Sequence, residues 1–200
     1  MSVFLHRHDL PADITFGKSV AIDTETKGLK LTRDRVCLVQ LSDGNGDAHL
    51  VQIAAEKQKS PHLEALLKDN TTEKLFHFAR FDLAVLARDV CLVSGPIYCT
   101  KIASKLSRTY TDRHGLKDLC SELLSVELSK QQQSSDWGAE ILTEAQKKYA
   151  ASDVLYLHRL KSKLDEQLTK EGRLDLAHHC FEFLKHRIAL DLGGFEDLDI

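Results

Sequence analysis

The stretch VAIDTETKGL, residues 20–29, decides how this sequence is interpreted. Val20–Asp23 is a short apolar run that ends in an acid, a pattern typical of a buried strand. Asp23 and Glu25 are two residues apart, and alternate residues of a strand point the same way, so both carboxylates are expected on one face. Burying two like charges is unfavourable unless a cation neutralises them, and Mg²⁺ and Mn²⁺ prefer oxygen ligands. The alternative is a strand end with two solvated acids.

Two more strands are expected directly after this stretch. Arg35–Leu41 is rich in apolar and β-branched residues, and Ala48–Ile53 has the same character. Asp43–Gly46 between them reads DGNG, which is a strong turn signal. Three strands with tight links predict an antiparallel meander.

The rest of the chain alternates helices and strands and then becomes helical. Thr143, with Gln146 three residues on, has the spacing of a capping box at the start of a long helix. The expected helices are Pro61–Lys68, Phe81–Arg88, Thr143–Leu168 and Leu174–Leu192; the expected strands are Lys74–Phe78 and Ile97–Cys99; the polar segment Val126–Gly138 is expected to be a loop. This order predicts an α/β fold with a mixed five-stranded sheet flanked by helices and a helical C-terminal part. We expect a single domain over residues 1–200.

Composition excludes several protein classes. The 200 residues are 42% hydrophobic and 28% charged, with 10 Gly, 3 Pro and 5 Cys, which excludes collagen, disorder and a disulfide scaffold. The odd number of cysteines, none in a C-x-x-C pair, favours a reducing compartment. Residues 1–14 show no apolar core of a signal peptide, and a cytoplasmic location is expected. The net charge of −3 argues against a general clamp for long nucleic acids.

Further acids and a tyrosine stand out later in the chain. Asp82 follows the fourth predicted strand, where an acid also suits the N-terminus of a helix. Tyr149 and Asp153 are four residues apart on a predicted helix, so they share one face. The alternative for this pair is a core tyrosine beside an unrelated surface acid.

Taken together, these positions resemble a known constellation. An acid pair on the first strand, an acid after the fourth strand and Tyr-x-x-x-Asp on a late helix resemble the DEDD superfamily of 3′-5′ exonucleases, in the tyrosine-bearing branch that includes ribonuclease D. The order of elements is similar to its ribonuclease H-like fold. The segments Val20–Leu29, Phe76–Leu86, Tyr98–Cys120, Leu128–Glu140 and Tyr149–His158 are similar to the nanoRNase C family of alphaproteobacteria.

The resemblance implies a site and a substrate. Its catalytic positions are Asp23, Glu25, Asp82, Tyr149 and Asp153. The four acids are expected to hold two divalent cations, Mg²⁺ or Mn²⁺, roughly 3.5–4 Å apart, with Tyr149 orienting the attacking water. The resemblance also implies very short RNA substrates, down to dinucleotides, nucleoside 5′-monophosphate products and a ring-shaped homo-octamer.

Candidate substrate contacts are spread over four segments. Leu29 is a candidate wedge between two bases, or else a core leucine, and Phe78 is a candidate stacking platform, or else core. Lys101–Lys117 holds five cations and one acid, a local charge of five minus one, or +4, which suits either a phosphate contact or a solvated helix face. The candidates are Thr26, Gly28, Leu29, His77, Phe78, Lys101, Arg108, Gln133 and Ser135.

Three functions remain open on sequence alone. The first is a metal-dependent exoribonuclease for short oligonucleotides. The second is a general 3′-5′ exonuclease that acts on longer RNA or DNA, and the third is a nucleic-acid-binding or scaffold protein without catalysis. We expect short substrates, because the residues after Asp153 suffice for one more helix but not for an accessory RNA-binding module, and because an acidic chain grips long phosphate chains weakly.

Overall fold

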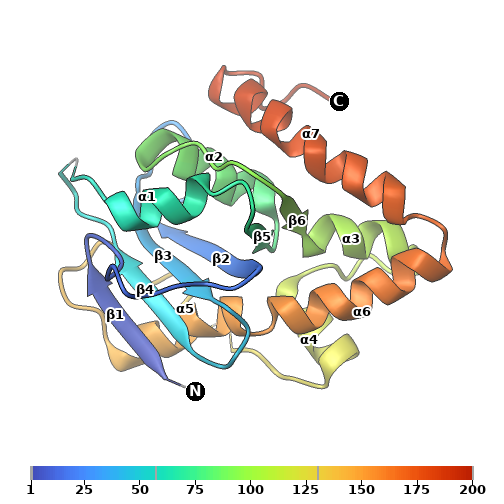
Figure 1. The fold of residues 1–200 in the computed structure, drawn as a ribbon, viewed down its shortest axis with the longest axis horizontal. Helices are drawn as coiled ribbons and strands as arrows, with labels where there is room; N and C mark the ends of the chain where they lie inside the picture. The colour runs from blue at the N-terminus through green and yellow to red at the C-terminus, as the bar shows by residue number, and fades with distance from the viewer. Residues whose placement is uncertain (1, 57, 130, 200) are drawn as a thin grey trace.

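A six-stranded mixed sheet organises the fold in the computed structural model, which describes residues 2–56, 58–129 and 131–199 (Figure 1). The strand order is β1-β4-β3-β2-β5-β6. The strands are β1 (Val3–Arg7), β2 (Ser19–Thr26), β3 (Val36–Ser42), β4 (Ala48–Gln52), β5 (Glu73–Phe76) and β6 (Ile97–Cys99). The five predicted strands are therefore present, with bounds that shift by a few residues.

Strands β2, β3 and β4 form the predicted antiparallel meander. Asp23 pairs with Gln40 of β3, and the register shifts at a bulge between Glu25 and Thr26, where β2 ends. Strand β5 pairs with β2 in parallel, and β6 pairs with β5 in parallel. The acid pair consequently lies on a strand with neighbours on both sides.

The sixth strand, β1, was not predicted. It pairs in parallel with β4, with Val3 opposite Ala48, at the outer edge of the sheet. Its residues are only partly buried, and its sequence ends in His6 and Arg7, so it lacks the apolar run that marks an internal strand. Parallel pairing with a strand far along the chain is a tertiary contact that local sequence does not encode.

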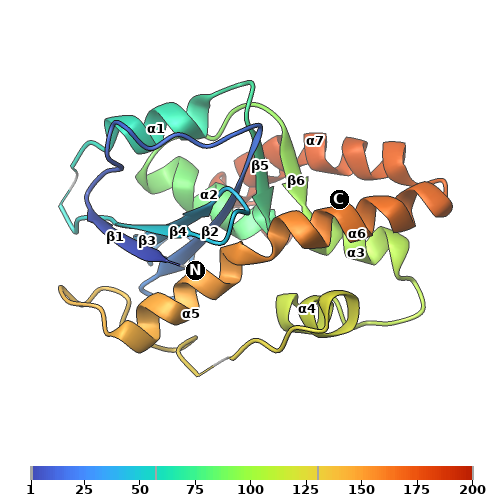
Figure 2. The ribbon, with the colours of Figure 1, turned by 60° about the horizontal axis from the view of Figure 1, so that its bottom comes forward.

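Helices cover both faces of the sheet, and a further group of helices lies beside its β6 edge. Helices α1 (Pro61–Lys68) and α2 (Ala79–Asp89) lie on one face, and α5 (Glu144–Leu155) crosses the other (Figure 2). The remaining helices, α3 (Thr100–Ser107), α4 (Leu116–Leu124), α6 (Leu157–Lys170) and α7 (Leu174–Leu192), gather beside β6. The predicted loop over 126–138 is free of helix and strand, and its Lys130 lies outside the described residues.

The single long helix predicted over Thr143–Leu168 is wrong. Two helices, α5 and α6, meet at Tyr156, whose backbone (φ −109°, ψ −5°) interrupts the helical hydrogen bonding. No proline or glycine marks the break. Helix α5 packs on the sheet, whereas α6 packs on α3, α4 and α7, so the change of direction lets each helix bury its own apolar face.

The core lies on both faces of the central strands. Every residue of β3 is buried, as expected for a strand covered by helices on both sides. A smaller cluster under α5 contains Leu38, Leu50, Trp137 and Leu142.

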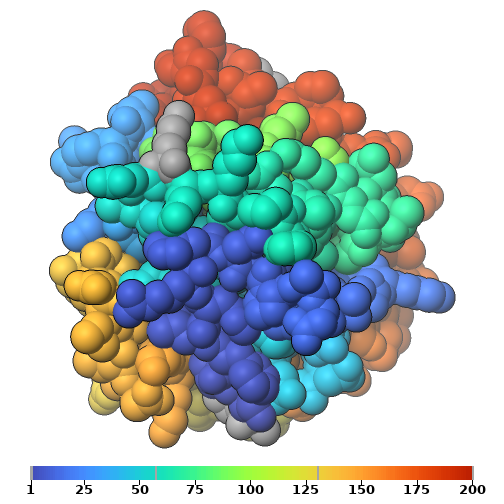
Figure 3. All heavy atoms as spheres, turned by 60° about the vertical axis from the view of Figure 1, so that its left-hand side comes forward, coloured from blue at the N-terminus to red at the C-terminus, as the bar shows by residue number. Residues whose placement is uncertain are grey.

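On the face shown in Figure 3, the N-terminal residues (dark blue) lie beside the α1 region (teal). Among the helices of the described residues, none has the length and apolarity that a bilayer crossing requires.

Candidate active site

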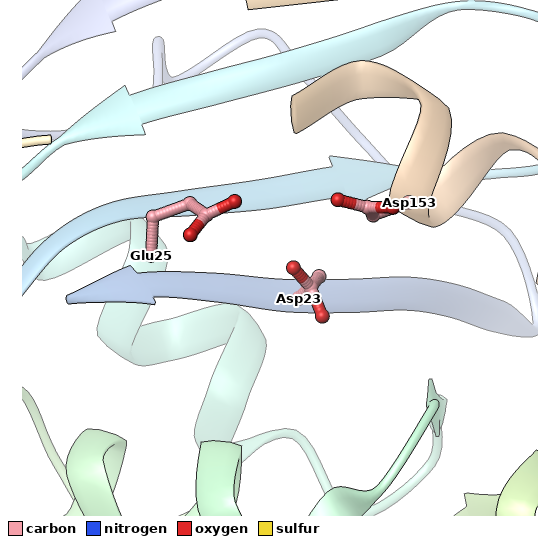
Figure 4. A group of neighbouring side chains, drawn as sticks. All are labelled: Asp23, Glu25 and Asp153. Atoms are coloured by element: carbon pink, nitrogen blue, oxygen red, sulfur yellow. The ribbon is translucent and has the colours of Figure 1, made fainter. Parts of the chain in front are cut away.

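Three carboxylates converge at the middle of the sheet. Asp23 and Glu25 project from the same face of β2, and Asp153 reaches them from α5 (Figure 4). Each offers an oxygen, and these oxygens lie within 4.8 Å of one another. The spacing of alternate strand residues therefore places the acid pair as predicted, and α5 adds the third acid by crossing above it.

Asp82 borders the same cleft from another direction. It lies in the first turn of α2, is 4% exposed, and accepts a 2.6 Å hydrogen bond from the Thr24 hydroxyl. Thr24 is the residue between the two acids of β2, so this bond ties α2 to the strand. Asp82 is not part of the three-carboxylate group, but the charges of Asp23 and Asp82 still act on each other.

Tyr149 lies one helical turn before Asp153, and its ring packs near Trp137, with 5.9 Å between the ring centroids. The capping box that starts α5 is present as predicted: Gln146 donates its backbone N–H to the Thr143 hydroxyl, and its side chain accepts from the Thr143 backbone. The cap and Trp137, which is 2% exposed, fix the helix that carries Tyr149 and Asp153.

Burial raises the pKa of every carboxyl in the site, and for Glu25, Asp82 and Asp153 the charges of neighbouring acids raise it further. Burial raises the pKa of Asp23 to about 7. Burial, together with the charges of Asp23, Asp153 and Asp82, raises the pKa of Glu25 to about 10. The pKa values of Asp82 and Asp153 also lie well above the usual range, through burial and the charge of Asp23. The pKa of the Tyr149 phenol is raised by burial and then by Asp153 and Glu25.

The donor set fits a divalent cation. Within the described residues, no lysine or arginine forms an ion pair with Asp23, Glu25 or Asp153. Clustered carboxylates without a basic partner resist ionisation, and a hard cation with a preference for oxygen relieves that cost. Asp23, Glu25 and Asp153 are the residues placed to hold it.

A cleft of about 340 Å³ surrounds these groups. All five predicted catalytic residues line it, and so do five of the predicted substrate contacts, namely Thr26, Leu29, His77, Phe78 and Gln133. Ten predicted residues from four separate segments of the chain thus line one cavity. Four other predicted contacts, Gly28, Lys101, Arg108 and Ser135, are not among its lining residues.

Leu29 is not a core residue. Its side chain is 85% exposed at the rim of the cleft, although it is apolar. This excludes the alternative of an ordinary core leucine. An apolar side chain held in solvent beside charged groups suits contact with a flat apolar partner such as a base.

Phe78 is also exposed, at 45%, and stands where β5 leads into α2. Its backbone is left-handed, with φ 67°, an uncommon conformation for an aromatic residue and one that often marks a functional site. The ammonium of Lys101 lies 4.0 Å from the ring centroid. The predicted contact Lys101 therefore touches a residue of the cleft without lining the cleft itself, and it lines the neighbouring groove beside α7.

His77 lines the cleft just after the end of β5, and its Nδ1 is 2.9 Å from the Thr100 hydroxyl. Burial, and then the charge of Lys101, lower the pKa of His77 to about 3. The imidazole is neutral at pH 7, so it offers the cleft a hydrogen bond and no charge.

Arg108 does not contact the cleft. Its side chain is fully buried, its guanidinium donates to Glu122 and to the Arg113 carbonyl, and it holds the turn after α3. Arg113 in turn pairs with Asp118. The predicted basic patch is thus partly neutralised within the fold, which sequence counting did not anticipate because the partner acids come later in the chain.

Gly28 and Ser135 have structural surroundings. A Cβ at Gly28 would overlap the carboxylate of Asp34, which accepts from the Lys30 backbone. Ser135 bonds Gln132 within the loop, at 2.8 Å. The glycine is therefore explained by the close approach of a side chain of this chain.

Sequence reasoning missed several residues that line the cleft: Thr24, Phe81, Gly115, Leu116, Lys117, Leu128 and Ser129. Thr24 carried a usable signal, since it lies between two acids on a strand and faces the side of α2. Lys117 was counted only as part of the basic patch. The others are apolar or small residues whose position depends on how α4 and the loop after it fold over the cleft.

Known proteins share this sequence and fold. The sequence model of a 3′-5′ exonuclease family matches residues 9–169. Ribonuclease D of Acidiphilium cryptum is 33% identical over 156 residues, which cover 78% of this chain and 39% of the relative. DNA polymerase I of Aquifex aeolicus is 36% identical over 168 residues, which cover 84% of this chain and 26% of the relative. The chain thus spans well under half the length of these curated relatives.

Solved structures match over most or all of the chain. Brucella melitensis NrnC with bound Mg²⁺ is 56% identical with a TM-score of 0.95, and the match covers 100% of this chain and 98% of that chain. The same protein bound to pGG gives a TM-score of 0.96 at 57% identity, with the same coverage. Ribonuclease D of Escherichia coli gives 0.76 at 29% identity over 86% of this chain and 45% of that chain.

Proposed function

This chain belongs to the ribonuclease D-like 3′-5′ exonuclease family, and from that premise we propose that it degrades short oligoribonucleotides, down to dinucleotides, to nucleoside 5′-monophosphates. The observation that carries the proposal is the cleft in which Asp23, Glu25 and Asp153 meet beside Tyr149. Its volume of about 340 Å³ suits a small ligand. The full-length similarity to a protein solved with Mg²⁺ and with pGG supports both the metal and the substrate class.

Asp23, Glu25, Asp82 and Asp153 would hold two divalent cations, Mg²⁺ or Mn²⁺, with Asp23 shared between them. When bound, such ions offset phosphate charge and lower the pKa of the attacking water. The protein contributes rigidity. The Thr24–Asp82 hydrogen bond and the pairing of Asp23 with Gln40 in the sheet fix carboxylates on α2 and β2 relative to each other.

Tyr149 would orient the attacking water by a hydrogen bond. Its raised pKa keeps the phenol protonated at pH 7, so it donates or accepts a hydrogen bond without acting as a general base. The predicted role of the tyrosine therefore fits its surroundings of carboxylates.

The substrate contacts would come from the cleft rim. Leu29 and Phe78 would meet the bases, while Thr26, His77 and Gln133 would provide hydrogen bonds. Lys101 would act by holding the Phe78 ring. We propose no direct contact for Gly28, Arg108 or Ser135.

A general 3′-5′ exonuclease acting on longer RNA or DNA is the second candidate. The 36% identity to a DNA polymerase I over 84% of this chain favours it.

The octameric ring implied by the family resemblance and the cytoplasmic location stay predictions. Light scattering tests the ring, for which the expected mass is eight times that of one chain.

One assay separates the candidates. Purified protein is mixed with a labelled dinucleotide, a ten-residue RNA and duplex DNA, with Mg²⁺, with Mn²⁺ and with chelator. Rapid metal-dependent loss of the dinucleotide alone supports the proposal, comparable loss of every polymer supports the second candidate, and no loss at all indicates a protein without catalysis.

The matched variants are Asp23→Ala, Asp153→Ala and, as a control, Asp13→Ala at an exposed position outside the cleft. The two cleft variants are expected to lose turnover while they remain folded. Near-normal activity in either of them would refute the metal assignment.

A further inference from the structure

The segment after α7 folds back toward the cleft. Residues 193–199, here named the acidic segment, turn at Gly194 (φ 86°) and run beside α7 (Figure 1). Its Glu196 and Asp197 line a pocket of about 590 Å³ together with Leu29, Phe78 and Phe81. Those last three residues also line the carboxylate cleft, so the two cavities adjoin across Leu29 and Phe78.

Two arginines hold the acidic segment in place. Arg187 is 6% exposed and donates to the carbonyls of Phe195, Glu196 and Leu198, at 2.7 to 2.9 Å. Arg80 donates to the Glu196 carbonyl at 2.8 Å and to both oxygens of Asp191 at 2.7 Å. The segment is therefore fixed by its backbone.

Arg80, which holds the acidic segment, lies on α2, the helix that also carries Asp82. Arg80 is two residues before Asp82 on α2, so the bonds to Arg80 place the segment relative to the carboxylate cleft. Because the arginines use backbone carbonyls, the side chains of Glu196 and Asp197 are left exposed. In the described residues neither of these two carboxylates accepts a hydrogen bond.

The adjoining pocket carries two acids, Glu196 and Asp197, that form no ion pair within the described residues. Its charged groups are Lys30, Arg80, Glu196 and Asp197, and Arg80 is already paired with Asp191. The four lining charges sum to two minus two, or 0, and the lining groups without an ion pair among the described residues are Lys30, Glu196 and Asp197. Because the two cavities adjoin across Leu29 and Phe78, a longer chain that continued past these residues would bring further phosphates to this pocket.

We infer that the acidic segment is a specificity determinant that opposes long substrates by electrostatic repulsion. The inference rests on the proposed function. Phosphates beyond the dinucleotide would face Glu196 and Asp197 at the rim, while the phosphate inside the cleft lies on the far side of Leu29 and Phe78. The segment therefore lowers the rate on long chains and leaves the rate on the dinucleotide unchanged.

The test compares the substrate preference of charge variants. Glu196→Gln/Asp197→Asn removes both charges, and Glu196→Lys/Asp197→Lys reverses them; Asp13→Asn/Glu166→Gln removes two exposed acids that line neither cavity. kcat/KM is measured for a dinucleotide and for a ten-residue RNA. The neutral variant is expected to gain several-fold on the long RNA, the reversed variant more, and the control nothing.

Salt separates repulsion from a structural effect. The gain is expected to vanish at about 1 M salt, where the screening length falls to about 3 Å. Thermal unfolding checks that the variants fold. A gain that persists at high salt, or no gain at low salt with dinucleotide activity intact, overturns the inference and leaves the proposed function standing.

The proposed function can fail separately. If the unaltered protein degrades the long RNA as fast as the dinucleotide, the proposed substrate class is wrong. In that case, a higher kcat/KM on the long RNA in the neutral variant still supports repulsion by the acidic segment. Equal kcat/KM values on the long RNA in all variants overturn it.

Discussion

Tyr149 shows how much one side chain depends on its position. It lies in the cleft with Asp153 one turn further along α5, and its phenol stays protonated. We predict that Tyr149→Phe lowers kcat by at least about 100-fold, because the loss of one positioned hydrogen-bonding group in an active site costs about that much. KM for the dinucleotide should change little.

The control for this prediction is Tyr110→Phe, a tyrosine that is 76% exposed. Steady-state kinetics of both variants provide the measurement. An unchanged kcat for Tyr149→Phe would remove the tyrosine from the mechanism.

The cluster of acids makes stability depend on pH and metal together. The pKa of Asp23, about 7 in the folded chain, lies above its unfolded value near ~3.9. The metal-free protein therefore has the full contribution of this group below about pH 4 and loses it as the pH rises through about 7. A divalent cation competes with protons for the same oxygens, so it binds more tightly at high pH.

We thus predict a larger increase in melting temperature on adding Mg²⁺ at pH 8 than at pH 6, measured by thermal unfolding after chelator treatment. Asp23→Asn/Asp153→Asn should abolish the difference. An equal Mg²⁺ shift at both pH values would contradict the raised pKa values.

At the residue scale, the grouping of the acids was predictable, whereas the surroundings of the candidate substrate contacts were only partly so. The i, i+2 acids and the i, i+4 pair Tyr149 and Asp153 follow from backbone periodicity, and both arrangements are confirmed. The exposure of Leu29 and the burial of Arg108 depend on neighbours that are distant in sequence, so residue type alone gave no answer.

At the scale of elements, α5 is the helix whose placement matters most. Its capping box satisfies backbone groups at a helix end beside the loop that holds Trp137. We predict that Thr143→Ala lowers the free energy of unfolding by about 1 kcal/mol, the usual value of such a cap. Because α5 carries two site residues, kcat should fall as well.

Chemical denaturation measures the first effect, with Thr109→Ala, at an exposed position outside the helices, as the control. Equal stability of the two variants would show that the cap contributes nothing. The cap itself was predictable, since it is a pattern of neighbouring residues. The end of α5 at Tyr156 was not, because the break follows from packing partners.

At the scale of the whole molecule, Asp191 joins α7 to α2. It is 1% exposed and accepts hydrogen bonds from Arg80 of α2 and Arg187 of α7. Burial alone would raise its pKa, but the hydrogen bonds and charges of the two arginines outweigh burial and lower it. A buried carboxylate between two arginines is costly to remove, because both guanidinium groups lose their partner.

We predict that Asp191→Asn lowers the free energy of unfolding by about 3 kcal/mol at pH 7. Because the folded pKa is depressed, the contribution of Asp191 is present above about pH 4 and is lost as the pH falls through its lowered pKa. The difference in free energy of unfolding between Asp191→Asn and the unaltered chain should therefore become smaller at acidic pH. Denaturation at pH 7 and at pH 3 measures this, with Glu182→Gln, an exposed acid on α7, as the control. A gap that is constant with pH would contradict the lowered pKa.

Local sequence was enough to predict the meander and the alternation of helices and strands, because each depends on a repeat or spacing within a few residues. The five catalytic candidates were identified by resemblance to known exonucleases, and their roles stay predictions. The sixth strand, the break between α5 and α6, and the position of the acidic segment beside the adjoining pocket became evident only from the fold. The physical reason is that these features arise from contacts between segments separated by many residues. β1 needs β4, α6 needs α3 and α7, and Glu196 needs Arg80, so no local pattern records them.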